Sequence, residues 1–180
     1  MVDGLSGAEI ILENVLVSHE NVMGEPGLAY PFIEQVIDEA CIAICAESVG
    51  LMSELVRTTV DYLKTREQFG SKIGSFQVLQ HRAVDMFNSL ELSRALVYRS
   101  AETISNVDNA KNRARAASAA KVQIGRSGKL IGQQAIQLHG GMGMTDELSV
   151  SHYFKRLTML GTLFGDIDHH LKRFVQLGEN

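Results

Sequence analysis

One apolar pattern constrains the fold of this chain more than any other feature. Between residues 76 and 104, apolar side chains recur every three or four residues, and Ser93 fills the single gap. The positions are Phe76, Leu79, Ala83, Met86, Leu90, Val97, Ala101 and Ile104. This spacing places them on one face of an α-helix of about eight turns, and that face must pack against other helices. The pattern therefore predicts a helix bundle.

Two further long segments have helical character. Residues 30–64 are apolar on several sides, which predicts a helix buried against several neighbours. Residues 110–138 carry a stripe of small and apolar side chains, namely Ala114, Ala117, Ile124, Gly128, Ile131, Ala135 and Leu138. Shorter helices are expected from about Leu148 and from Leu163 to Leu177. Together these segments predict an all-α fold, an antiparallel four-helix-type bundle over residues 28–180.

Residues 1–27 differ from the rest of the chain. The segment from Glu9 to Val17 is rich in β-branched residues and partly alternates, which predicts one N-terminal β-strand. The following residues, HENVMGEP, have the composition of a turn. A single strand cannot satisfy its own edge hydrogen bonds. We therefore interpret residues 1–27 as a strand and linker, either the end of a larger β-domain or an arm that docks elsewhere.

Composition excludes several classes of function. The 180 residues include 17 basic and 21 acidic side chains, a formal charge of −4, so no basic surplus supports binding to nucleic acid or to an anionic membrane. The sequence contains neither a signal-peptide pattern nor an apolar run of about 18 residues. Its two cysteines, Cys41 and Cys45, lie in an apolar segment and indicate a reducing compartment. We expect a cytoplasmic location.

Metal-binding and hydrolase motifs are weak or missing. A di-iron bundle needs Glu-x-x-His on two helices, and the sequence has no such motif. The nearest candidate is Asp166-Ile167-Asp168-His169-His170. Adjacent histidines on a helix point about 100° apart and do not readily serve one ion, so we expect no metal site. A Gly-x-Ser-x-Gly nucleophile motif is also lacking.

Two segments are richer in chemistry than ordinary turns. The first, Arg66-Glu67-Gln68-Phe69-Gly70 followed by Phe76-Gln77, combines a cation, an aromatic ring and amides around a glycine. Such a set can bind a phosphate and pack against a planar ring. The second, residues 137–143 (QLHGGMG), has three glycines in four positions, more than a helix C-terminus requires. Taken singly, each segment could also be a plain interhelical turn.

In this order, the two segments resemble the C-terminal helical domain of the acyl-CoA dehydrogenases. The resemblance runs from about residue 8 to the C-terminus and includes the basic-aromatic segment 150–155 (VSHYFK). Residues 9–24 match the end of that family's central β-domain. Members of the family oxidise an acyl-CoA thioester at Cα–Cβ: a glutamate removes the α-proton and FAD accepts the β-hydride. The resemblance implies an FAD-dependent oxidoreductase.

The resemblance also implies roles for individual residues. Arg66 would contact the FAD pyrophosphate, and Asp38 would contact CoA. The other cofactor-binding positions are Phe69 and Gln77 along the cofactor, Gln137 and Gly141 at its adenosine end, and Asp166 and Asp168. In this family the contacts are made to FAD held mainly by a neighbouring subunit, so a homo- or hetero-oligomer, a dimer or tetramer, is expected.

The catalytic base is where the sequence departs from the family. A gapless match from Val150 places Phe164 at the position of the glutamate, and Phe cannot accept a proton. A rival register places Leu160 there. Some members carry the glutamate on the first helix of this domain, where this chain has Ala40 and, one residue away, Glu39.

The C-terminal segment that departs from the usual family pattern comprises residues 152–158 (HYFKRLT) and 164–173 (FGDIDHHLKR). It is similar to that of a heteromeric branch of the family that acts on steroid side-chain thioesters, in which one subunit type can lack the base. Three hypotheses remain open: a domain that completes a partner's FAD site without its own base, a self-sufficient domain using Glu39, and a structural bundle that binds no cofactor.

Overall fold

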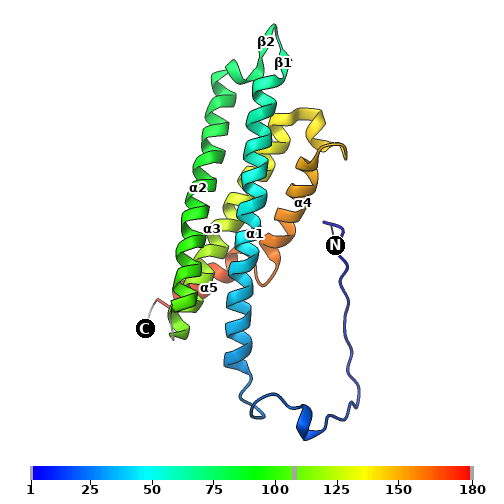
Figure 1. Cartoon of the computed structure of the whole chain (residues 1–180), viewed down its shortest axis with the longest axis vertical. Coiled ribbons are helices and arrows are strands. Elements are labelled where there is room, and N and C mark those ends of the chain that lie inside the picture. The colour runs from blue at the N-terminus through cyan, green and yellow to red at the C-terminus, as the bar shows by residue number, and fades with distance from the viewer. Residues whose placement is uncertain (1, 107–108, 179–180) are drawn as a thin grey trace.

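The computed structural model describes residues 2–106 and 109–178 (Figure 1). Three long helices form the body of the bundle: α1 (Tyr30–Thr65), α2 (Gln77–Asn106) and α3 (Ala110–His139). They run alternately up and down, and α4 (Ser149–Thr162) returns along α3. The last helix, α5 (Ile167–Gln176), packs on α3. The predicted antiparallel, four-helix-type bundle is confirmed.

The connections between the helices are short. A hairpin of β1 (Glu67–Gln68) and β2 (Ser71–Lys72) joins α1 to α2, with Glu67 opposite Lys72 and Gln68 opposite Ser71. Three 3₁₀ turns complete the described structure: η1 (His19–Asn21), η2 (Ile73–Ser75) and η3 (Gly140–Met144). At the start of α3, the Asn109 side chain accepts hydrogen bonds from the backbone N–H groups of Lys111 and Asn112 and so caps the helix.

The predicted apolar seams form the core. On α2, Met86, Leu90 and Val97 are buried, and Ser93 in the gap is buried with them. All seven stripe positions of α3 are buried. Two further glycines of α3 lie where neighbouring helices pack closely. A Cβ added at Gly132 would lie 2.5 Å from the Phe154 ring of α4. At Gly125 an added Cβ would lie 2.6 Å from Ile167 of α5. These glycines set how closely α4 and α5 approach α3.

Three expectations are corrected by the structure. Residues 9–17 form no strand and are exposed, because no other part of residues 2–106 and 109–178 lies beside them to complete a sheet (Figure 1). The first turns of α1 are not buried, since Ile33 and Val36 are 54% and 64% exposed. The final helix begins at Ile167 rather than Leu163, because residues 163–166 form a loop with two residues of positive φ.

The remaining checks concern membrane insertion and the thiols. Within residues 2–106 and 109–178, none of the helices combines the length and apolar composition needed to cross a bilayer. Cys41 and Cys45 are buried and unpaired. Burial raises the pKa of the Cys45 thiol to about 12, so the thiol stays protonated and inert at neutral pH.

Candidate functional site

The β1–β2 hairpin displays an aromatic ring on a strained backbone. At its tip, Phe69 and Gly70 both have positive φ values, 55° and 77°, the geometry of a tight two-residue hairpin turn. For a residue other than glycine this conformation costs roughly 1–2 kcal/mol. Phe69 is nevertheless 92% exposed and contacts Phe76 edge-on, with ring centroids 6.2 Å apart. The turn therefore holds the ring outward instead of burying it.

Polar side chains at the two ends of the connection between α1 and α2 are exposed and have no partner among the described residues. Arg66 follows α1 directly, and its backbone carbonyl accepts a hydrogen bond of 2.9 Å from Ile73. Its guanidinium is exposed and makes no hydrogen bond or ion pair with any residue that the structure describes. The Gln77 amide, at the first residue of α2, is likewise exposed and has no partner among the described residues. The hairpin thus offers a cation, an amide and a ring to another molecule.

The glycine-rich segment lies at the same end of the bundle (Figure 1). The Tyr62 ring of α1 stacks on the His139 ring at the end of α3, with centroids 4.5 Å apart, and so links the approach to the hairpin with the second segment. Gln137 and Gly141 are both exposed there. Gly143 is required for close packing, since a Cβ would lie 2.7 Å from the Ile136 carbonyl oxygen. The structure therefore places the two motifs at the same end of the bundle.

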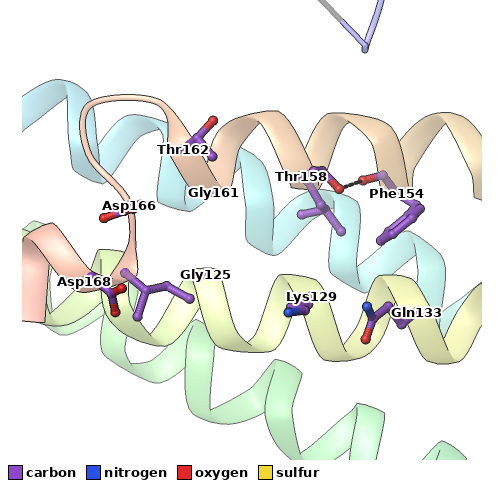
Figure 2. Close-up of a pocket in the computed structure, with 11 residues that line it drawn as sticks. Gly125, Lys129, Gln133, Phe154, Thr158, Gly161, Thr162, Asp166 and Asp168 are labelled. Atoms are coloured by element: carbon purple, nitrogen blue, oxygen red, sulfur yellow. Dashed lines mark hydrogen bonds between the residues drawn. The ribbon is translucent and has the colours of Figure 1, made fainter.

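Asp166 and Asp168 lie elsewhere, at the junction of α4 and α5. They line a pocket of about 480 Å³ between α3, α4 and α5, together with Gly125, Lys129, Gln133, Phe154, Leu157, Thr158, Gly161, Thr162 and Ile167. Figure 2 shows the two carboxylates at one end of the pocket and Gln133 with Phe154 at the other. Asp166 also caps α5, because its Oδ1 accepts a hydrogen bond of 2.8 Å from the His169 N–H. This hydrogen bond from the backbone N–H of His169 holds the pKa of the Asp166 carboxyl below its usual value.

Phe164 occupies the loop between α4 and α5 but does not line that pocket. Its φ is 57° and its side chain is 40% exposed. It faces a different pocket, of about 590 Å³, shared with Tyr30 and Ile33 of α1 and with His169 of α5. Glu39 is exposed on α1, where its carboxylate accepts a hydrogen bond of 2.9 Å from Gln35 Nε2. The structure does not place Glu39 among the residues that line the Phe164 pocket.

Asp38 has an internal role. The side chain is fully buried on α1, where it pairs with Arg173 of α5 through both carboxylate oxygens and with Arg113 of α3 at 3.4 Å. Arg173 also donates to Glu34 at 3.0 Å. The contact between Asp38 and CoA stays a prediction, and in this conformation Arg113 and Arg173 already occupy the carboxylate.

Two buried polar residues lie beside the α4–α5 loop: Lys121, which sequence reasoning missed, and His170, which it weighed only as a metal ligand. Lys121 is 2% exposed, and its position four residues after Ala117 and three before Ile124 puts it in the apolar stripe of α3. A lysine at a stripe position is a signal that the sequence already carries. Burial lowers the pKa of Lys121 and lowers that of His170 to about 4. Within the described residues, no group of three or more His, Cys, Asp or Glu could hold a metal ion.

Comparison with known proteins identifies the family. Residues 30–175 match the model of the acyl-CoA dehydrogenase C-terminal domain, so the chain belongs to this family of FAD-dependent acyl-CoA dehydrogenation enzymes. The human short-chain specific acyl-CoA dehydrogenase of mitochondria is 30% identical over 154 residues, which are 86% of this chain and 37% of that protein. The caffeyl-CoA reductase–Etf complex subunit CarC of Acetobacterium woodii is 32% identical over 84% of this chain and 39% of its own length. The chain thus spans less than half of these relatives.

Solved structures agree with the assignment. A Tcur3481–Tcur3483 steroid ACAD variant superposes with a TM-score of 0.76 at 28% identity, over 84% of this chain and 40% of that one. PigA with FAD and proline superposes with a TM-score of 0.72 at 28% identity, over 78% of this chain and 36% of that one. Family members thus bind FAD, and one relative forms a complex with Etf.

Proposed function

We propose that this chain contributes contacts to FAD across a subunit interface, for the α,β-dehydrogenation of an acyl-CoA thioester. The observation that carries the proposal is the exposed Arg66 guanidinium, which has no partner among the described residues, three positions before an aromatic ring held outward at positive φ. A chain that used this hairpin only as a connection would gain stability from glycine at position 69. The cost is explained if Phe69 meets a second molecule.

The residues at this end of the bundle fit FAD. A guanidinium binds a phosphate group through paired, charge-assisted hydrogen bonds, which suits Arg66 to the pyrophosphate. The exposed amides of Gln77 and Gln137 can donate and accept, and Gly141 lets a backbone approach a ligand closely. When bound, FAD supplies the acceptor for a hydride. This chain's own part is to bind and orient the cofactor, while a partner chain of the same family holds most of it.

The chain's own catalytic base is missing in this proposal. The sequence match places Phe164 at the family's usual base position, and Phe164 lines a pocket together with Tyr30, Ile33 and Ile37 of α1. The steroid ACAD among the structural neighbours supports a heteromeric arrangement, in which a partner supplies the base. We propose such a hetero-oligomer, located in the cytoplasm. Phe164→Glu in the assembled complex is then expected to create acyl-CoA oxidation, measured as reduction of an artificial electron acceptor, where the parent complex shows little.

Co-purification tests the proposal directly. The chain is co-expressed with candidate full-length family members, and bound flavin is measured by absorbance near 450 nm, the usual region of oxidised flavin. We expect flavin to co-elute with the complex and to be lost in Arg66→Ala. Arg57→Ala is the matched control, because Arg57 is an exposed arginine of α1 paired only with Glu54 and Asp61 among the described residues. Equal flavin content in both variants would contradict the proposal.

Two rival functions make different predictions. If Glu39 were the base of a self-sufficient domain, Glu39→Gln would abolish turnover; we expect turnover of the complex to be unchanged. If the chain were a structural bundle without a cofactor, added FAD would leave the melting temperature of the complex unchanged. A binder is stabilised by mass action, by about 2.7 kcal/mol at a FAD concentration 100 times the Kd.

A further inference from the structure

Three backbone carbonyls around Phe164 receive hydrogen bonds from buried side chains of other helices. Lys121 of α3 donates to the carbonyl oxygens of Leu160 and Leu163, at 2.7 and 2.8 Å. His170 of α5 lies with its Nε2 3.1 Å from the Phe164 carbonyl oxygen. Carbonyls at a helix C-terminus have no partner within the helix. Here α3 and α5 supply these partners, so the loop is held from two sides.

Lys121 is an unusual residue to bury. It is 2% exposed, and among the described residues no carboxylate forms an ion pair with it. An ammonium removed from water without a paired charge is costly, and leucine or methionine would fill a similar volume without that cost. The negative end of the α4 dipole and the two carbonyls offset part of it. Such a lysine is better explained by the conformation that it selects than by the stability that it adds.

The His170 ring is neutral at neutral pH, and its hydrogen-bond partners assign its tautomer. Burial lowers its pKa to about 4, so the ring is neutral at pH 7, with one N–H and one bare nitrogen. The Phe164 carbonyl can only accept, which assigns the proton to Nε2 and leaves Nδ1 to accept from the Ser118 hydroxyl at 3.3 Å. Ser118 is fully buried on α3. The three groups form a directional chain from α3 through α5 to the loop.

The loop itself is built to accept this contact. Gly165 has a φ of 109°, and a Cβ there would lie 2.6 Å from His169 Cδ2 and 3.1 Å from His170 Nε2. Only glycine both adopts this φ readily and lets His170 approach the Phe164 carbonyl. Phe164 is itself at positive φ, a strained conformation that persists only where the surroundings determine it. The surroundings that determine the conformation here are the hydrogen bonds from Lys121 and His170 and the lack of a side chain at Gly165.

We propose that Lys121 and His170 are positioning residues that hold the loop of residues 163–166 in one conformation and thereby fix the direction of the side chain at position 164. The functional meaning of this role rests on the proposed function, since position 164 is where the family places its base. The holding itself is a property of this chain alone. The proposal therefore predicts that the hydrogen bonds from Lys121 and His170 would also orient a glutamate placed at position 164.

A single tryptophan tests the proposal, because the chain has none of its own. Phe164→Trp places a fluorescent reporter in the loop, and acrylamide quenching with time-resolved anisotropy reports its exposure and mobility in the full chain without flavin. Lys121→Met and His170→Ala are added singly, and Ser118→Ala serves as a milder variant that leaves the His170 ring in place. Val97→Ala, on α2, is the control for a loss of stability away from the loop. Lys121→Arg is the conservative variant.

We expect Lys121→Met and His170→Ala to raise the quenching constant about twofold or more, with faster depolarisation, and Ser118→Ala to raise it less. Lys121→Arg should restore most of the parent value, and Val97→Ala should leave it unchanged despite a lower melting temperature. The proposal is overturned if the loop variants match the parent, or if Val97→Ala has the same effect. If Lys121→Met and His170→Ala do not fold, an unchanged value in Ser118→Ala overturns it. Because no flavin is present, failure of flavin co-purification leaves this result intact.

Discussion

The hairpin end and the α4–α5 loop are both strained, but they treat their side chains in opposite ways. At the hairpin, Phe69 has a positive φ and its ring is 92% exposed, while the Arg66 guanidinium has no partner among the described residues. At the loop, Phe164 also has a positive φ, but three surrounding carbonyls are bonded to buried Lys121 and His170. The first region leaves a ring and a cation open to another molecule, whereas the second makes its hydrogen bonds to buried side chains of the same chain.

This difference separates binding from stability. Substitutions at the hairpin end remove groups that contact little of this chain, so they should change cofactor binding and leave folding nearly unaffected. Substitutions of the buried side chains that contact α5 and the α4–α5 loop should lower the stability of the fold and change cofactor binding little. Family resemblance predicts a site role for residues of both kinds, which differ in how deeply their side chains are buried. Asp38 belongs to the second kind in this structure, because its carboxylate is fully buried and paired with Arg113 and Arg173; its contact with CoA stays a prediction.

The largest effect is expected for Asp38→Ala. Removing the carboxylate leaves Arg113 and Arg173 without their shared buried partner, which typically costs about 3–5 kcal/mol. Glu34→Ala is the matched control, because Glu34 pairs with the same Arg173 but is a third exposed, and we expect a loss of under about 1 kcal/mol. Urea denaturation measures both. A loss below about 1 kcal/mol for Asp38→Ala would place Asp38 with the binding residues instead.

The next effect is a pH dependence that belongs to His170. Its pKa is about 4 in the folded chain against 6.5 ordinarily, so between these values the unfolded state binds the proton more readily. The stability present above pH 6.5 is therefore lost as the pH falls from 6.5 through about 4, by on the order of 3 kcal/mol. His170→Gln should lack this component when both proteins are unfolded by urea across that range. Parallel pH profiles for the two proteins would count against a buried neutral imidazole.

A smaller effect is expected where α3 contacts α4. Gly132→Ala places a methyl group 2.5 Å from the Phe154 ring, and such overpacking costs about 1–3 kcal/mol. Gly50→Ala is the control, because an added Cβ on α1 meets nothing within 4 Å and should stabilise the helix by about 0.4–1 kcal/mol. Thermal unfolding of the two variants should therefore shift in opposite directions. A shift in the same direction would mean that α4 moves freely to accept the methyl group.

The smallest effect isolates the strain at the hairpin tip. Phe69→Gly and Phe69→Ala both remove the ring, but only glycine adopts positive φ without strain, so the glycine variant should be more stable by about 1 kcal/mol. Both should lose FAD affinity to the same extent, since both lack the ring. If the glycine variant instead binds FAD as the parent does, the exposed ring has no part in cofactor binding.

The sequence predicted most of the bundle and only part of the site. Strong periodicity located α2 and the stripe of α3, because burial of one helix face dictates the spacing of apolar residues. It failed at residues 9–17, where a segment of strand-forming composition pairs with no strand of the described residues, and at residues 163–166, where local φ values end the helix. The hairpin and glycine motifs were visible as residue types. The spacing of residues does not specify contacts between helices. It therefore did not predict that Tyr62 stacks on His139 near the two motifs, or that Lys121 donates hydrogen bonds to the loop carbonyls.

The most direct test of the central claim compares FAD binding by the assembled complex when either of two exposed arginines is replaced. Flavin is removed, and FAD is titrated back while its fluorescence is followed, for the parent, Arg66→Ala and Arg57→Ala. A lost charge-assisted contact to phosphate is worth about 1.5–3 kcal/mol, so Arg66→Ala should weaken binding roughly 10- to 100-fold. Arg57→Ala should bind as the parent does, and without FAD Arg66→Ala should melt close to the parent, because its guanidinium makes no hydrogen bond or ion pair with a described residue. An unchanged Kd in Arg66→Ala would contradict the claim that the hairpin end completes a flavin site.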